Sequence, residues 1–577
     1  MILKALYDYY YRCGNLPAPG MEEKEIGFII VLSKEGRFLR FEDCRADKNK
    51  GRIYLVKKHV SRSSAAIANY LYDNGAYVLG YSDKQDNEDK VRSYFDTFVK
   101  KVKSIQDEMP DNPDIQILMN FYAQGRETIL AEIEQDPLWE DIKKNLSKKY
   151  SIFSFRIEGD LKILAEKKEL LLVDNGSRND GSQGLCMVTG NKGELVDTTT
   201  ATMIAGSQAT AKLVAFQVNS GYDSYGKEKC GNAPISQEAE FAYTTALNTM
   251  LQKGSHNRFM VGNRTFVFWA SSKEEAAEQA EEGLFDLLGY SEEKEDNPNA
   301  KIEQVRKVFN AIYSGSIKTN LEDYFYILGL APNSARIAVV YWSETPLRVF
   351  AGKILQHFAD MEIIDTRKEK KPYMGIKEIL SAVTSGGKQS ESTPNLPESI
   401  IKSIFQGTPY PYTLLSACVR RIRAESADNN ATRITRIAII KAFLNRQNDN
   451  DKKIELMLDK SNTNQGYLCG RLFAVLARIQ EEANGISSIR ERYMNAASST
   501  PSSVFATILN LSSHHLENMS NEGKKVFYEK LKQEIIDKIS ADGFPAHLDL
   551  QDQGRFFVGY YHQRQDFFTK KEEDSKN

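Results

Sequence analysis

The spacing of apolar residues changes near residue 384, and this change constrains the fold more than any other feature. Before it, short apolar runs such as residues 26–32 and 336–342 lie between helical patterns, which predicts strands in a mixed region. After it, apolar residues recur at helical spacing in segments such as 412–425 and 467–484. The pattern predicts an α+β (mixed) fold, with a multi-lobed N-terminal α/β region followed by a C-terminal α-helical bundle.

The segment TSGGKQSESTPNLPES, residues 384–399, is rich in Ser, Gly and Pro and almost free of apolar residues. This composition is typical of a linker. A chain of 577 residues is also too long for one core. We therefore expect an N-terminal region at 1–383, a linker at 384–399 and the helical bundle at 400–577.

Overall charge and apolar content restrict the class of protein. The formal net charge is -2, so any binding to nucleic acid must come from local basic patches. No apolar run reaches the length of about 18 residues that a membrane helix needs, and the first residues lack a signal-peptide pattern. We expect a cytoplasmic protein. The six cysteines form no CxxC pair, so we expect no structural zinc.

Residues 55–83, LVKKHVSRSSAAIANYLYDNGAYVLGYSD, combine cations, an amide and aromatic rings. Cations neutralise phosphates, an amide can bond a base edge, and flat rings stack on bases. The alternative is a basic strand and a buried aromatic helix, which composition alone favours. The candidate side chains are Lys57, Lys58, Arg62, Asn69, Tyr70, Tyr72 and Tyr77.

Two further clusters carry similar chemistry. The segment YDSYGKEK alternates rings and cations, which suits a contact to RNA or to a DNA backbone but equally suits a polar turn. Its residues are Tyr222, Tyr225, Lys227 and Lys229. The first helices after residue 400 are rich in arginine, which favours a strand-guiding groove as much as a solvated face. These arginines are Arg420, Arg421, Arg423, Arg433, Arg436 and Arg446.

Common catalytic motifs are missing from the sequence: it has no GxSxG, no P-loop and no HExxH. Asp160 and Glu166, followed by Lys168, could imitate the carboxylates and lysine of a metal-dependent nuclease. A solvated face that leads into a strand explains the same residues more simply. His514 and His515 are adjacent and diverge on a helix, so we do not expect them to share a metal.

Several longer blocks point to a specific family. They are MILKALYDYYYR at the start, CMVTG (186–190), YDSYGKEKCGNAPISQEAEFAYTTALN (222–248), FYILGLAPNSARIAVVYW (325–342) and FPAHLDLQDQGRFFVGYYHQRQDFF (544–568). In this order they resemble the large subunit of the type I-C CRISPR Cascade surveillance complex, a Csd-type protein. The resemblance extends over essentially the whole chain.

The resemblance implies a noncatalytic subunit without a cofactor, in which a guide RNA reads sequence while the protein inspects the protospacer-adjacent motif (PAM) and begins to open the duplex. It also implies R-loop formation and recruitment of a helicase-nuclease. The implied partners are the CRISPR RNA, the double-stranded target and its displaced strand, the Cascade backbone subunits, the CRISPR-RNA-processing subunit, small subunits from the same gene, the helicase-nuclease and phage anti-CRISPR proteins, with no membrane.

On this resemblance, residues 55–83 correspond to the PAM-reading segment. Asn69 would contact a base, Lys57, Lys58 and Arg62 would hold phosphates, and Asn74 or Tyr77 would support or wedge the opened pair. Ala68 replaces a proline that we expect in many relatives, so the shape of the loop stays open.

The family also implies that the C-terminal helices are made separately from an internal start. Met457 is the best placed methionine, and Met494 is a weaker alternative. We expect the aromatic residues of the closing segment, 554–568, to dock into a core rather than to stack on bases. A metal-dependent nuclease that uses Asp160 and Glu166, and a purely structural assembly subunit, remain the alternative functions.

Overall fold

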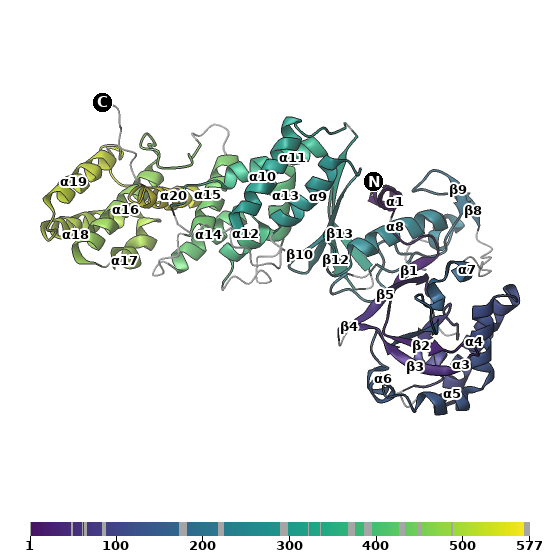
Figure 1. Cartoon of the computed structure of the whole chain (residues 1–577). Helices are drawn as coiled ribbons and strands as arrows, with labels where there is room; N and C mark the ends of the chain where they lie inside the picture. The colour runs from purple at the N-terminus through teal and green to yellow at the C-terminus, as the bar shows by residue number, and fades with distance from the viewer. Residues whose placement is uncertain are drawn as a thin grey trace. The chain divides into compact units, whose positions relative to one another are not determined.

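A computed structural model provides the fold and divides the chain into two compact units. The small unit contains Cys13–Thr199 and Phe216–Thr245, and the large unit contains Met1–Arg12, Thr200–Ala215 and Ala246–Asn577. The structure describes residues 2–14, 16–47, 50–60, 62, 66–82, 88–171, 182–202, 204–216, 224–288, 298–320, 322–334, 336–366, 375–385, 395–425, 433–447, 453–485 and 488–569. Figure 1 shows the elements of both units.

A four-stranded mixed sheet forms the core of the small unit, in the order β3-β2-β7-β6. Its central strand β2 (Phe28–Leu32) is buried along its whole length, which explains why the sequence FIIVL is continuously apolar. Strand β2 pairs antiparallel with β3 (Phe38–Asp43) and parallel with β7 (Ile152–Ile157). Strand β6 (Tyr72–Asn74) closes the other edge.

Helices and short elements complete the small unit (Figure 1). Buried apolar side chains of its longer helices join the core of the sheet. The helices are α2 (Gly75–Val78), α3 (Glu88–Glu108), α4 (Pro113–Ala123), α5 (Arg126–Ile133), α6 (Trp139–Asn145), α7 (Lys168–Leu171) and the first part of α8 (Gln237–Met250). Short 3-10 turns are η1 (Leu164–Glu166), η2 (Ser224–Gly226) and η3 (Lys229–Asn232), and a hairpin joins β8 (Gln183–Leu185) to β9 (Lys192–Glu194).

A second sheet in the small unit has the order β1-β5-β4. Strand β1 (Met21–Ile26) pairs along its full length with β5 (Lys50–Lys57), and β4 (Arg45–Asp47) lies on the other side of β5. This pairing places Lys57, the last residue of β5, opposite Met21. The candidate segment therefore begins at the end of a paired strand.

The large unit contains an antiparallel sheet in the order β10-β11-β12-β13. Its strands are β10 (Arg258–Val261), β11 (Arg264–Ala270), β12 (Tyr324–Asn333) and β13 (Arg336–Pro346), and β13 confirms the strand predicted at 336–342. Helices α9 (Glu275–Leu287), α10 (Pro298–Ser314) and α11 (Leu347–Met361) belong to the same core. The rings of Phe325 and Phe350 stack at 4.3 Å and join β12 to α11.

The remaining described elements of the large unit are helical, so the predicted α+β class with a helical C-terminal region is confirmed. The N-terminal helix α1 (Ile2–Cys13) is anchored by Arg12, whose guanidinium donates to the Ser272 carbonyl and pairs with Glu281. The C-terminal helices are α12 (Ile376–Val383), α13 (Leu396–Gln406), α14 (Tyr412–Ala424), α15 (Ile434–Gln447), α16 (Gln465–Asn484), α17 (Ser488–Ala497), α18 (Phe505–Glu517), α19 (Glu522–Ile536) and α20 (Leu550–Asp566).

The division into units differs from the expected boundary at 384–399. One apolar core extends from the sheet of the large unit to α20, so the C-terminal helices do not form a separate core. Helix α13 begins at Leu396, inside the expected linker, and the ring of its Phe405 contacts Phe350 at 5.8 Å. Residues 386–394 lie outside the described residues. The linker composition therefore does not mark the boundary between the two units.

The closing aromatic segment forms most of α20 and is buried, as expected from its composition. Phe556, Phe557, Tyr560 and His562 all lie in the core. Among the described helices, none combines the length and apolar character that a membrane-spanning segment needs.

Candidate nucleic-acid interface

Asn69 is held by its backbone and by one atom of its amide. The side chain is only 7% exposed, and its Oδ1 accepts a hydrogen bond of 2.9 Å from the Val60 amide. The backbone N–H of Asn69 donates a hydrogen bond to Oδ2 of Asp73 at 2.9 Å. Its Nδ2 has no hydrogen-bond partner among the residues that the structure describes. Among the described residues, the side chain therefore offers its donor, and its oxygen already accepts one hydrogen bond.

Asp73 organises this segment, and its role was not predicted from the sequence. Its buried carboxylate accepts hydrogen bonds from the backbone N–H groups of Asn69 and Asn74 and forms an ion pair with Arg62. A buried carboxylate requires such partners because an unpaired charge is costly. The available signal was that Asp73 is the single acid between Lys57 and Tyr77.

Arg62 lies across the surface of this segment. Its Nε donates to the Ile67 carbonyl at 2.7 Å, and its guanidinium lies 4.0 Å from the centre of the Tyr77 ring. Tyr77 in turn stacks on Tyr94 at 4.7 Å. The guanidinium therefore has a structural role in addition to any contact with phosphate.

Lys57 and Lys58 lie beside aromatic rings in the small unit. The Lys57 Nζ is 4.2 Å from the centre of the Tyr70 ring, and the Lys58 Nζ is 5.6 Å from that of Phe241. Both lysines are partly exposed. The contact with Phe241, at the start of α8, connects residues 55–83 to the segment that follows YDSYGKEK.

Tyr70, Tyr72 and Tyr77 belong to the core, so the burial predicted by the alternative interpretation is confirmed. The single aromatic helix that it predicted is wrong, because Tyr72 lies in β6 and only Tyr77 lies in a helix, α2. Tyr70 donates to the Leu170 carbonyl at 2.7 Å, and Tyr72 donates to the Lys57 carbonyl at 2.8 Å. Burial raises the pKa of both phenols well above their ordinary value. Tyr77 is buried as well, so it would have to leave its stack on Tyr94 to act as a wedge.

Asn74 caps helix α2. Its Oδ1 accepts from the amides of Ala76 and Tyr77, which is the usual role of an asparagine at this position. The cap explains this asparagine without a nucleic-acid contact, and support of an opened base pair stays a prediction.

A groove of about 1120 Å³ runs beside Lys58 in the small unit. The hairpin β8–β9, Gly20 and the start of α8 line it. Its cations are Lys58 and Lys192, whereas its acids are Glu194, Asp197, Glu238 and Glu240. Because acids outnumber cations, the groove is electrostatically unsuited to a phosphate backbone.

The YDSYGKEK segment is described from Ser224 onward, and Tyr222 lies outside the described residues. Tyr225 and Lys227 are exposed, and Lys229 pairs with Asp197. The segment is therefore a polar loop that carries one outward-facing ring and two cations. A nucleic-acid contact stays a prediction for these residues.

The arginines after residue 400 fall into two groups. Arg420 is exposed and Arg423 is half-buried, both on α14, and neither forms an ion pair or hydrogen bond with a described residue. Arg433 donates to the carbonyls of Ser381 and Ala382. Arg420 and Arg423 on α14 are therefore more available to a ligand than Arg433, whose guanidinium is engaged by two carbonyls.

Arg436 and Arg446 are buried and structural. Arg436 pairs with Glu425 at 2.6 Å and donates to the Ala382 carbonyl at 2.7 Å, and Arg421 binds the same Glu425. The hydrogen bond from Arg436, together with that from Arg421, lowers the pKa of Glu425 to about 2 although partial burial opposes this shift. Arg446 pairs with Asp360. Because the Arg436 side chain is fully buried, it cannot contact the phosphate backbone of a nucleic acid in this packing.

Of the two carboxylates in the nuclease alternative, Asp160 is already paired with a lysine. Lys167 Nζ lies 2.6 Å from Asp160 and 2.7 Å from Asp114. Glu166 lies in the 3-10 turn η1. In the described ranges, no three His, Cys, Asp or Glu side chains gather as metal ligands would. His514 pairs with Glu517 on α18. This arrangement gives the nuclease alternative no support.

Met457 lies in a nonhelical segment before α16 and is 54% exposed. Helix α16 has its own cap, because Asn464 Oδ1 accepts from the Tyr467 amide at 3.0 Å. A product that begins at Met457 would contain α16 to α20 complete. This supports the predicted internal start, which stays a prediction.

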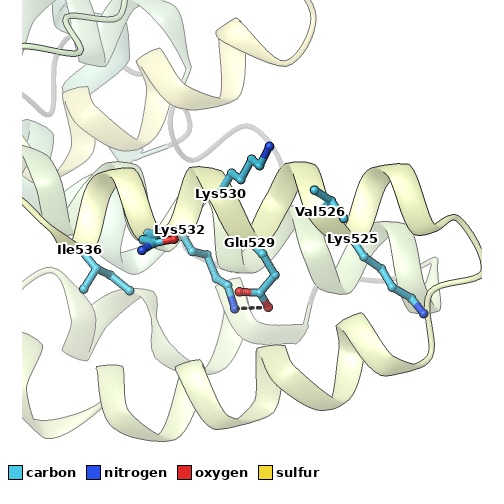
Figure 2. A pocket seen from close by; sticks show the side chains of 7 residues that line it. Lys525, Val526, Glu529, Lys530, Lys532 and Ile536 are labelled. Atoms are coloured by element: carbon cyan, nitrogen blue, oxygen red, sulfur yellow. Dashed lines mark hydrogen bonds and ion pairs between the residues drawn. The ribbon is translucent and has the colours of Figure 1, made fainter.

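Helix α19 carries a surface hollow of about 480 Å³ (Figure 2). Its lining residues all come from this helix, and Lys532 is paired with Glu529 at 2.9 Å. No second element converges on the hollow, so we assign it no ligand.

The comparison with known families assigns the class of protein. A family model described as CRISPR-associated protein (Cas_Csd1) matches residues 6–568, which is nearly the whole chain, so this is a CRISPR-associated, Cascade-type subunit of a multi-subunit complex. The chain belongs to the Csd1 family. This match confirms the predicted resemblance to a Csd-type large subunit. No curated protein matches the chain.

Proposed function

We propose that the chain is a noncatalytic large subunit that recognises a short flanking motif, the PAM, in duplex DNA and begins strand separation and R-loop formation beside the guide RNA. The Nδ2 donor of Asn69 carries the proposal, because the residue is oriented by the Val60 backbone N–H and by the buried carboxylate of Asp73, which also pairs with the cation Arg62. Membership in the Csd1 family supports it.

The occupied acceptor of Asn69 refines how the motif is read. Because one lone pair of Oδ1 is taken by the Val60 backbone N–H, we expect the side chain to meet a base through its Nδ2 donor. Acceptors for such a donor are guanine O6 and N7, adenine N7 and thymine O4 in the major groove, and adenine N3 and thymine O2 in the minor groove. We therefore expect Asn69 to contact a base acceptor rather than to form a two-bond fork with adenine.

Phosphates and the displaced strand would be held by separate basic surfaces. Lys57, Lys58 and Arg62 would position the duplex, and Arg420 and Arg423 on α14 would guide the displaced strand. Recruitment of the helicase-nuclease would follow strand displacement, as in related RNA-guided complexes.

The substitution Asn69→Asp tests the base contact. It preserves the acceptor for the Val60 backbone N–H but replaces the donor by an acceptor, so motif discrimination should fall. Because the new carboxylate is buried and close to Asp73, the thermal unfolding midpoint of the variant is measured alongside, to separate a lost base contact from a destabilised segment. A lost base contact contributes about 1 to 3 kcal/mol, or roughly 5- to 150-fold. The measurement is competition between targets with intact and altered motifs, using the assembled complex at several salt concentrations.

A matched control is Asn112→Asp, which adds the same charge at the N-cap of α4 in the same unit. Asparagine and aspartate are both good caps, so this variant should discriminate motifs as the wild type does. Equal discrimination by the Asn69→Asp variant and the wild type would exclude Asn69 as the reader. If the wild-type complex showed no preference for any flanking motif, the assembly-subunit alternative would be favoured instead.

A further inference from the structure

Tyr225 is the most outward-facing aromatic residue that the structure describes. Its side chain is 95% exposed, whereas the other exposed aromatic residues lie between 44% and 54%. A ring with no apolar neighbours contributes nothing to the core. The ring is therefore available for a contact outside the unit.

The backbone at Tyr225 is held in a costly conformation. With φ of 59° and ψ of 30°, it occupies the left-handed region, which a residue with a side chain rarely adopts. Glycine would occupy this position without strain, and Gly226 directly follows in the same region. A tyrosine at a strained, exposed position is a candidate for function, because such strain is typical of functional sites.

The base of the loop is anchored, so the ring is presented from a fixed support. Buried Cys230 donates to the Ala233 carbonyl at 3.0 Å, and the Gly231 amide donates to the Glu228 carbonyl at 2.8 Å. Lys229 also pairs with Asp197. The same small unit contains Asn69 and Lys58.

The charges beside the ring favour a nucleic acid over a protein partner. Lys227 is exposed and has no ion pair or hydrogen bond with a described residue, and Lys229 follows two positions later. An aromatic face flanked by cations is the usual platform for an unpaired base with its phosphate. A protein anchor would instead be surrounded by apolar surface.

We propose that Tyr225 stacks on one unpaired nucleobase, supplied either by the opened target duplex or by the CRISPR RNA. The inference rests on the proposed function and adds a base-holding residue that stabilises the separated strands. Lys227 would hold the adjacent phosphate.

Abasic substitutions scanned through the target strands and, separately, through the RNA test this proposal with the assembled complex. In wild type and in Tyr225→Phe, removal of one particular base should weaken target binding about fivefold or more, since base–aromatic stacking has this magnitude. In Tyr225→Leu, binding to the intact target should fall by the same factor, and removal of that base should have no further effect. The coupling is the dependence of the abasic effect on the Tyr225 ring. It should occur in only one of the two scans, and that scan identifies whether the DNA or the RNA supplies the base.

Two variants separate stacking from folding. Tyr225→Gly relieves the backbone strain, so its thermal unfolding midpoint should rise while the coupling to the base is lost. Tyr313→Leu removes another exposed ring and should leave the coupling intact. Unchanged binding by Tyr225→Leu, or a loss that adds equally to every abasic position, would overturn the proposal.

A loss of binding in Tyr225→Leu that adds equally to every abasic position would indicate that Tyr225 contacts a protein. Because motif discrimination is measured independently with Asn69→Asp, failure of the Tyr225 proposal leaves the proposed function standing. If the wild-type complex showed no preference for any flanking motif, the proposed function itself would be wrong.

Discussion

Individual side chains near the candidate interface show how strongly burial determines a residue's role. Arg62 and Asn69 both satisfy the buried carboxylate of Asp73, and Asn69 Nδ2 has no partner among the residues that the structure describes. Arg436, equally cationic in the sequence, is fully buried and holds α14 and α15 together through Glu425. A residue type therefore indicates which chemistry is available, and its surroundings decide whether that chemistry reaches a ligand.

His562 provides a test at this scale, because burial lowers its pKa to about 3 and nearby Lys441 acts in the same direction, against Asp459. The ordinary histidine pKa is about 6.5, so the unfolded chain binds more protons between pH 6.5 and 3. Stability should therefore fall as pH falls through this window, by about 2 kcal/mol between pH 7 and pH 5. His562→Gln should remove this part of the decrease.

Thermal unfolding midpoints of the large unit at pH 7 and pH 5 provide the measurement. The variant is compared with wild type at both pH values, because a change in stability that is unrelated to titration of His562 should shift both midpoints alike. Identical pH dependence in wild type and His562→Gln would show that His562 does not titrate in this window.

At the scale of elements, the contact between α16 and α20 depends on glycine. A Cβ built on Gly470 would overlap the carbonyl oxygen of Phe556, and one built on Gly559 would overlap that of Tyr467. Without these side chains the two backbones approach closely. The buried Tyr467 and His562 then meet across the contact, with 3.0 Å between the Tyr467 hydroxyl and His562 Nδ1.

We expect Gly470→Ala to destabilise the large unit by about 3 kcal/mol or more, because a rigid backbone cannot yield as a side chain can. Denaturant unfolding followed by helical signal measures the change. Gly523→Ala is the control, since its Cβ would meet only the Asn521 side chain on α19 and alanine favours a helix. Equal stability of Gly470→Ala and wild type would contradict the close approach.

At the scale of the whole molecule, the chain combines a unit that carries the candidate PAM reader with a unit whose sheet and helices share one core. Helix α20 packs closely against α15: a Cβ built on Gly554 of α20 would lie only 2.9 Å from the side chain of Ile440 on α15. A separate product of residues 457–577 would lack α14 and α15. We therefore expect such a product to expose part of α20 and to bind other subunits through that face.

The internal start has a direct test in Met457→Leu. Met457 is exposed, so leucine should leave the full-length chain intact while the small product disappears from the purified complex. Intact-mass measurement of the subunits detects both species, and Met494→Leu serves as the control. Persistence of a product that begins at residue 457 or nearby would show that translation does not depend on this methionine.

The sequence by itself determined the class of fold, the helical C-terminal region, the docking of the closing aromatic segment and the family. These properties depend on local periodicity and on residue order, which are visible along the chain. Only the tertiary structure decided which cations reach the surface, that Asp73 organises the Asn69 segment, and that the core continues past residues 384–399. It also showed that Tyr225 faces outward from a strained backbone. Burial and long-range pairing join residues that are distant in sequence, so no local pattern of residues could specify them.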